Sequence, residues 1–249
     1  MTTLALDCVG RSDVGRRRNN EDAWFASPRL AAVADGVGGA AAGEVASRTI
    51  IDALVSLDKR RLDDPLDQAL ADAVRFGNQT IGFIAECRPP MAGMSTTLTA
   101  VALSDDGEYL VANVGDSRTY LLRDGELLRL TRDDSLVQGL IDAGEITLEE
   151  ARTHPQRSVV LCALDGSRDW VPALRSLEAR LGDRLLLCSD GLSDVLGDDA
   201  IAAALRHPSR DAAAQRLVEL ALQAGARDNV SVVVADAVPR RDPSAAWRP

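Results

Sequence analysis

The stretch from residue 95 to residue 130 constrains the fold of this chain most strongly. It consists of the short apolar segments STTLTAVAL, EYLVANV, SRTYLLR and ELLRL, separated by Asp-Asp-Gly, Gly-Asp and Asp-Gly. Aspartate and glycine favour tight turns, because aspartate hydrogen-bonds to its own backbone and glycine accepts positive φ angles. Strands joined by such short turns pair antiparallel, since parallel strands need a long crossover. The stretch therefore predicts tandem β-hairpins.

The other helical and strand-like segments occur in separate blocks. The chain opens with the strand-like segments LALDCV, NEDAWFAS and RLAAVAD, and apolar residues at helical spacing follow over 43–57 and again from Asp64-Pro65 onward. After the hairpins we expect short helices over 135–143 and 147–152, strands over 170–177 and 184–188, helices over 198–205 and 209–224, and a last strand over 229–235. Blocks of this kind predict an α+β fold in which helices cover antiparallel sheets, and they argue against a parallel βαβ fold.

Composition limits the class of protein. Of the 249 residues, 46% are hydrophobic, which is enough to build a core. A formal net charge of −10 and only 3% aromatic residues argue against general binding to nucleic acid or to an anionic membrane. No apolar run is long enough to span a bilayer, and the N-terminus lacks the pattern of a secretory signal. We therefore expect a cytoplasmic protein with one domain over 1–238 and a flexible tail over 239–249.

The cysteines and histidines give no sign of a thiol nucleophile or a zinc site. Cys8, Cys87, Cys162 and Cys188 are dispersed without a C-x-x-C pair, and the chain has only two histidines. Cys8 and Cys188 lie in apolar, strand-like segments, so reduced cysteines packed in the core are the simpler interpretation.

Aspartate residues border several apolar strands. Asp35, Asp116 and Asp190 follow such strands, and Asp228 precedes one. Each alone is typical of a turn. Strand ends of an antiparallel sandwich can, however, meet at one rim, where four carboxylates would repel one another and need a cation. A cluster of oxygen ligands without His or Cys suits Mg²⁺ or Mn²⁺.

The segment GRRRNNED at 15–22 places three arginines next to two carboxylates. A solvated polar loop is the simpler interpretation. The functional alternative is that one guanidinium binds a phosphate while the acids hold a metal ion or its waters. Together with the aspartates, this alternative points to a phosphate ester as the substrate.

The chain resembles the metal-dependent protein phosphatases, the type 2C serine/threonine phosphatases, in their compact bacterial form. The resemblance covers about residues 4–237 and rests on the ordered motifs DVGRRRNNEDAW, VADGVGGAAAGEVAS, GMSTTLTAVAL, ANVGDSRTYLLRDGEL, LTRDDSLVQGLIDAGEIT, EARTHPQR, LLLCSDGLSDVL and ARDNVSVVVAD. It implies a four-layer α/β/β/α sandwich, with two central antiparallel sheets flanked by pairs of helices.

The resemblance also implies a metal centre. Asp35 would bridge two Mn²⁺ or Mg²⁺ ions, and the carbonyl of Gly36 would bind one of them. Asp190 and Asp228 would complete the shell of the other ion. Asp116, together with Asp190, matches a third and weaker metal site.

Further roles follow from the same resemblance. Arg17 matches the arginine that binds substrate phosphate, and Glu21 and Asp22 would position metal-bound water and the metal site. Asp194 would contribute from outside the ligand shell. Residues 133–166 correspond to a flap that shapes access of protein substrates.

The implied activity is hydrolysis of phosphoserine and phosphothreonine in proteins, by direct attack of a water that bridges the two ions. The implied partners are phosphoproteins, including a cognate bacterial serine/threonine kinase, and the family form is usually a monomer. The alternative is a catalytically silent binding or regulatory module with the same fold.

Changed residues in the flap motivate this alternative, and the chain departs from the family pattern at other positions as well. Val37 stands where many eukaryotic members have a histidine proposed as general acid, and Ala40 replaces a histidine of the bacterial pattern. In the flap, Asp134 and Cys162 differ from the usual residues. Outside the flap, Arg227 differs from the usual residue before the last predicted metal ligand. None of these positions is a predicted metal ligand, so the phosphatase remains the preferred interpretation.

Overall fold

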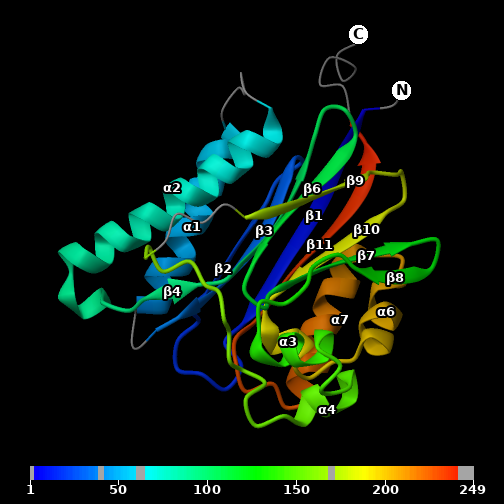
Figure 1. Ribbon diagram of the computed structural model, residues 1–249. Helices are drawn as coiled ribbons and strands as arrows, with labels where there is room; N and C mark the ends of the chain where they lie inside the picture. Colours follow the sequence, from blue (N-terminus) through cyan, green and yellow to red (C-terminus); the bar gives the residue numbers. More distant parts are fainter. Residues whose placement is uncertain (1–2, 39–41, 60–64, 168–171, 241–249) are drawn as a thin grey trace.

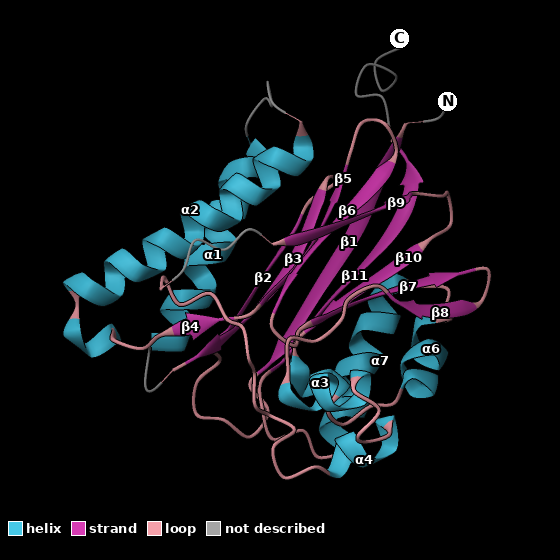
Figure 2. Cartoon of the chain, in the orientation of Figure 1, coloured by secondary structure: helices cyan, strands magenta, loops and turns pink. Residues whose placement is uncertain are grey.

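The computed structural model describes residues 3–38, 42–59, 65–167 and 172–240 (Figure 1). Two antiparallel sheets form its centre (Figure 2). The first has the strand order β1 (Leu4–Asp13), β11 (Val230–Pro239), β10 (Arg184–Cys188), β7 (Arg118–Arg123) and β8 (Glu126–Arg129). The second has the order β2 (Asp22–Ala26), β3 (Leu30–Val37), β5 (Leu98–Leu103), β6 (Glu108–Val114) and β9 (Ala173–Glu178), with β4 (Ser95–Thr96) paired to β3.

A pair of helices covers the outer face of each sheet. The helices α1 (Ala42–Lys59) and α2 (Leu66–Cys87) lie over the second sheet, and α6 (Asp198–Leu205) and α7 (Arg210–Gln223) lie over the first (Figure 1). The shorter elements are η1 (Pro89–Met91), α3 (Leu136–Asp142), α4 (Leu148–Thr153) and α5 (Asp190–Ser193). This arrangement confirms the predicted α+β sandwich of four layers. Among the described helices, none combines the length and apolar character needed to cross a membrane.

Alternating side chains of the central strands supply separate cores. In β3, Ala32 and Ala34 pack beneath α1 and α2, whereas Ala31 and Val33 pack between the sheets. In β11, Val232 and Val234 face α6 and α7, and the intervening Val233 faces the other sheet. Strands buried on both faces explain why these segments read as continuous apolar runs rather than as alternating ones.

One predicted hairpin is wrong. The strands β6 and β7 on either side of Gly115-Asp116 do not pair, because they belong to different sheets. Gly115 has a φ of +94°, and a Cβ there would lie 2.7 Å from Thr97 Cγ2. The turn is therefore a crossing between the sheets, which brings Asp116 to the edge where both sheets end.

The remaining boundaries follow the sequence closely. The expected helix over 43–57 is α1, and the helix expected from Asp64-Pro65 is α2, which begins at Leu66 and continues through Gly77 and Gly82. Gly77 allows close packing, since a Cβ there would lie 2.5 Å from Ile50 Cδ1 of α1. Part of the strand expected over 170–177 lies outside the described residues. Pro239, the first residue of the expected tail, is the last residue of β11, and 241–249 also lie outside the description.

Candidate active site

The predicted aspartates come together at one end of the sandwich. Asp35 lies near the end of β3 and Asp116 directly follows the crossing turn after β6. Asp190 begins α5 immediately after β10, and Asp228 precedes β11. Asp190 is close enough to the other three for their charges or hydrogen bonds to affect its pKa. The structure thus gathers residues that are up to 193 positions apart (228 − 35).

Asp35 and Asp190 form the centre of this cluster. Both carboxylates are largely enclosed by protein, although each residue keeps some contact with solvent. Burial raises the pKa of Asp35 well above its usual range, and the carboxylates of Asp22 and Asp190 raise it further. Burial also raises the pKa of Asp190, with Asp116 as the next cause. These shifts reflect negative charges that are held together without a counter-charge.

The backbone of Asp35 is fixed by the neighbouring threonines. Its N–H donates to Thr97 Oγ1 at 3.1 Å, and its carbonyl accepts from Thr97 N and from Thr96 Oγ1, both at 2.9 Å. Thr97 is itself hydrogen-bonded to Ser117 at 2.7 Å, in the segment that carries Asp116. These bonds hold the strand end in place while its carboxylate stays available.

Asp22 lies opposite Asp35 in the pairing of β2 with β3. Its Oδ2 accepts a hydrogen bond from Ser189 Oγ at 2.8 Å, which links it to the residue before Asp190. Burial raises the pKa of Asp22 to about 6, and the same cause raises that of Asp116 to about 6. Within the described residues, Asp22 Oδ1 and Asp190 Oδ1 are buried and have no hydrogen-bond partner.

These carboxylates suit a hard divalent cation. Enclosed oxygens without partners, raised carboxyl pKa values and mutual repulsion would all be relieved by a positive ion. No three Asp, Glu, His or Cys side chains in the described part of the chain form a ligand group by themselves. Backbone carbonyls and water would therefore have to complete the shell, as is usual for Mg²⁺.

Two close approaches bring α1 against this end of β3. A Cβ at Gly36 would lie 2.2 Å from the carbonyl oxygen of Gly43, and a Cβ at Gly43 would lie 2.3 Å from Glu21 Oε2. The Glu21 carbonyl accepts from Gly36 N at 3.2 Å and from Ser47 Oγ at 2.6 Å. The two glycines thus leave room for the Glu21 carboxylate beside the strand end, and burial raises the pKa of this carboxyl.

Arg17 contacts one of the predicted metal ligands. Its Nη2 lies 2.5 Å from Asp228 Oδ2, and this hydrogen-bonded pair raises the pKa of the guanidinium. The Arg17 side chain is 60% exposed, so water competes with the ion pair. The predicted phosphate-binding arginine therefore lies at the rim of the carboxylate cluster, paired with Asp228.

Asn229 is a site residue that the sequence analysis missed. Its Oδ1 accepts from Glu21 N at 2.8 Å, and its Nδ2 donates to the carbonyls of Val14 and Asn19 at 2.9 and 3.0 Å. It thereby fixes both ends of the arginine-rich loop next to Asp228. The sequence shows only that this polar residue lies between Asp228 and an apolar strand, which does not reveal its distant partners.

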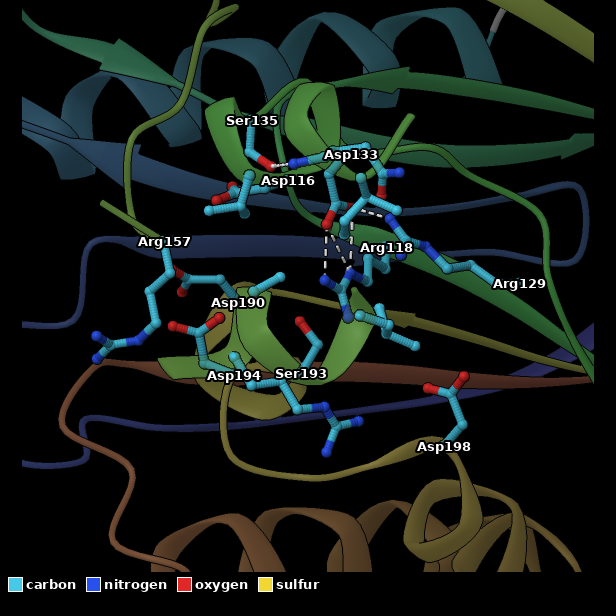
Figure 3. Close-up of a pocket in the computed structure, with 16 residues that line it drawn as sticks. Asp116, Arg118, Arg129, Asp133, Ser135, Arg157, Asp190, Ser193, Asp194 and Asp198 are labelled. Carbon is cyan, nitrogen blue, oxygen red and sulfur yellow. Dashed lines mark hydrogen bonds and ion pairs between the residues drawn. The ribbon is translucent and has the colours of Figure 1, made fainter. Parts of the chain in front are cut away.

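A pocket adjoins the carboxylate cluster below the flap (Figure 3). Asp116, Asp190 and Asp194 contribute to its lining. Burial is the main cause that raises the pKa of Asp194, and Arg118 and Arg157 act in the opposite direction. Asp194 therefore lies near the predicted ligands Asp116 and Asp190.

The flap over 133–166 is tied to the sheets at both ends. Asp134 Oδ2 accepts from Gly115 N at 3.1 Å, and Asp134 N donates to the Gly115 carbonyl at 2.9 Å. At the other end, Leu164 forms an isolated bridge with Thr96. Asp134, one of the departures from the family pattern, thus braces the turn that carries Asp116.

The other departures are exposed, packed against a core, or outside the description. Val37 is 48% exposed, and Arg227 is exposed. Cys162 is partly buried against the core beneath α1 and α2. Ala40 lies outside the described residues.

Comparisons with known proteins identify relatives of this chain. A family model described as Protein phosphatase 2C matches residues 9–228. The serine/threonine protein phosphatase PstP of Mycobacterium tuberculosis is 52% identical over 237 residues, which are 95% of this chain and 46% of the relative. The serine/threonine phosphatase stp of Listeria monocytogenes is 33% identical over 237 residues, covering 91% of this chain and 94% of the relative. The chain thus spans about half the length of the mycobacterial relative.

Solved structures match equally well. The crystal structure of Mycobacterium tuberculosis PstP has a TM-score of 0.89 at 51% identity and covers 93% of this chain and 98% of that one. A structure of the PstP catalytic domain in complex with two manganese ions also has a TM-score of 0.89, at 49% identity, with 95% and 100% covered. Sequence, fold and the family match agree over nearly the whole chain, which therefore belongs to the protein phosphatase 2C family.

Proposed function

We propose that this chain is a phosphoserine/phosphothreonine protein phosphatase that depends on Mn²⁺ or Mg²⁺. The observation that carries the proposal is the convergence of Asp35, Asp116, Asp190 and Asp228 beside Arg17. It is supported by the relatives, which are named serine/threonine protein phosphatases, and by the manganese ions in one related catalytic domain.

The proposed metal centre uses the residues at the strand ends. Asp35 and the Gly36 carbonyl would hold one ion, with Asp35 shared with a second ion that Asp190 and Asp228 would also hold. Asp116, with Asp190, would hold a third ion more weakly. When bound, the ions supply the positive charge that activates water for direct attack on phosphorus.

The remaining site residues act on the substrate and on water. Arg17 exchanges Asp228 for the substrate phosphate and stabilises charge on its oxygens, because a guanidinium pairs well with phosphate. Asp22 and Glu21 orient water at the metal centre, and Asp22 is held for this task by Ser189.

The proposed partners are phosphoproteins in a signalling circuit, including a cognate bacterial serine/threonine kinase, and the proposed form is a cytoplasmic monomer. The second candidate function is a catalytically silent binding module. The enclosed aspartates argue against it. Carboxylates packed together repel one another, so they destabilise a protein that binds no cation between them.

Hydrolysis of a phosphothreonine peptide tests the proposal. We expect phosphate release that rises with added Mn²⁺ and stops when a chelator is added. Asp190→Asn should lower turnover by orders of magnitude, whereas Asp52→Asn on the exposed face of α1 removes the same charge and should keep it. Folded wild-type protein that releases no phosphate at any Mn²⁺ or Mg²⁺ concentration would support the silent module.

A further inference from the structure

The pocket below the flap is lined by charged side chains of both signs. It encloses about 90 Å³ of space, well above what one water molecule needs. Four of its lining residues are arginines: Arg118, Arg129, Arg152 and Arg157. Five aspartates line it as well: Asp116, Asp133, Asp190, Asp194 and Asp198. The arginines therefore matter for binding only where no carboxylate pairs with them.

Two of these arginines form ion pairs with the same carboxylate, that of Asp133. Arg118 donates to both oxygens of Asp133, with Nη2 2.6 Å from Oδ2, and Arg129 also pairs with Asp133. Both arginine side chains are only about one-fifth exposed, and the Asp133 side chain is 6% exposed. This cluster anchors the start of the flap to β7 and β8 (Figure 3).

The other two arginines have no such partner. Within the described residues, neither Arg152 nor Arg157 forms an ion pair or a side-chain hydrogen bond with a carboxylate. Arg157 lies near Asp194, whose pKa it lowers (Figure 3). The guanidinium of Arg152 lies over Gly197, where an added Cβ would be 3.2 Å from both terminal nitrogens.

The backbone supports Arg152 in this place. Its helix α4 begins with a capping box, in which the Thr147 side chain accepts from Glu150 N and the Glu150 carboxylate accepts from Thr147 N. The pocket offers one more polar group, since Ser193 Oγ is buried without a partner among the described residues. Both arginines are exposed, and guanidinium groups without a hydrogen-bonded carboxylate can bind a phosphate, which accepts two parallel hydrogen bonds from each fork.

We propose that this pocket binds a second phosphorylated residue of the substrate, close in sequence to the residue that is hydrolysed, and that Arg152 and Arg157 recognise it. The inference rests on the proposed phosphatase activity. The pocket begins at Asp116 and Asp190, so its occupant would be adjacent to the reacting phosphate. Divalent cations at those aspartates would offset the negative charge of the pocket's carboxylates.

Matched peptides test this proposal. One peptide carries a single phosphothreonine, and the others carry a second phosphothreonine at successive positions on either side of it. For at least one position, we expect the second phosphate to raise kcat/KM for the first by about tenfold, the effect of one charge-assisted hydrogen bond of moderate strength. Glutamate at that position should give a smaller gain, because it carries one negative charge.

Variants identify the residues responsible. Arg152→Gln with Arg157→Gln should bring the ratio of kcat/KM for the two kinds of peptide close to one. Arg216→Gln removes a similar charge from the exposed face of α7, where the arginine lies 3.9 Å from Glu219, and should keep the ratio. The ratio compares two substrates of the same protein, so a general loss of activity does not affect it.

Two results would overturn the proposal. One is equal kcat/KM for all peptides with the wild-type protein, and the other is a gain that survives in the double variant. Failure of the phosphatase function itself is distinguishable, because it would abolish release from the singly phosphorylated peptide as well.

Discussion

The position of the Asp190 carboxylate lowers the stability of the metal-free protein. It is enclosed near Asp35, Asp116 and Asp228, and its Oδ1 has no hydrogen-bond partner in the part of the chain described. Removing one of several crowded charges relieves repulsion when no cation is present. A ligand of a metal centre is therefore expected to cost stability in the metal-free protein.

Asp190→Asn should accordingly stabilise the metal-free protein. We expect a gain of about 1 kcal/mol, or about 2–4 °C in Tm for a chain of this size, in thermal unfolding with chelator present. Added Mn²⁺ should raise the Tm of the wild type by mass action and that of the variant much less. Equal stabilisation of both proteins by Mn²⁺ would exclude Asp190 as a ligand, and Asp52→Asn serves as the control.

Residues differ in how far the sequence reveals their role. The site aspartates could be found because each borders an apolar strand, and the strands of a sandwich end at common edges. The ion pair between Arg17 and Asp228, 211 positions apart, could not be found, because a pair at such separation leaves no local pattern. Asn229 was missed for the same reason, since its partners Glu21, Val14 and Asn19 are distant in the sequence.

At the scale of elements, the turn at Gly115-Asp116 was predicted correctly, but the pairing of the two strands on either side of it was not. Gly115-Asp116 forms a turn, as its composition predicts, yet β6 and β7 continue into different sheets. A hairpin and a crossing between sheets can use the same residues at the turn. The difference lies in which strands lie alongside, and this depends on packing of the whole sandwich.

The contact between the end of the flap and α2 gives a test at this scale. Gly166 has a φ of +79°, and a Cβ there would lie 2.2 Å from Gly82 Cα. Gly144 has a φ of +72°, but a Cβ there would meet nothing within 4 Å. The two positions therefore separate backbone strain from steric conflict within the same flap.

Gly144→Ala should destabilise the protein by about 1–2 kcal/mol, which is the cost of the left-handed conformation alone. Gly166→Ala should cost a further 1–3 kcal/mol or so, because its Cβ also conflicts with the backbone of α2. Denaturant unfolding of both variants measures the difference. Equal losses would show that the flap does not depend on this contact.

The whole molecule joins two halves at the site. Each sheet carries its own pair of helices over a separate core, and a third core lies between the sheets. The second sheet supplies Asp35 and leads to Asp116, and the first borders Asp190 and Asp228. The cluster therefore forms only when both sheets are packed together, which couples a metal centre at this place to the fold of the entire chain.

The order of helical and strand-like segments was sufficient to predict the layers of this molecule. Alternation of side chains could not assign the faces of β3 and β11, because both strands are buried on both sides. Strand order within each sheet was also beyond local patterns, since β1 pairs with β11 from the other end of the chain.

Calorimetric titration of the metal-free protein with Mn²⁺ tests the central claim most directly. We predict at least two bound ions per chain, as in the related catalytic domain, with binding weakened severely by Asp190→Asn and unchanged by Asp52→Asn. Heat of binding that is absent in folded wild-type protein, or that is the same in Asp190→Asn, would contradict a metal centre built from these aspartates.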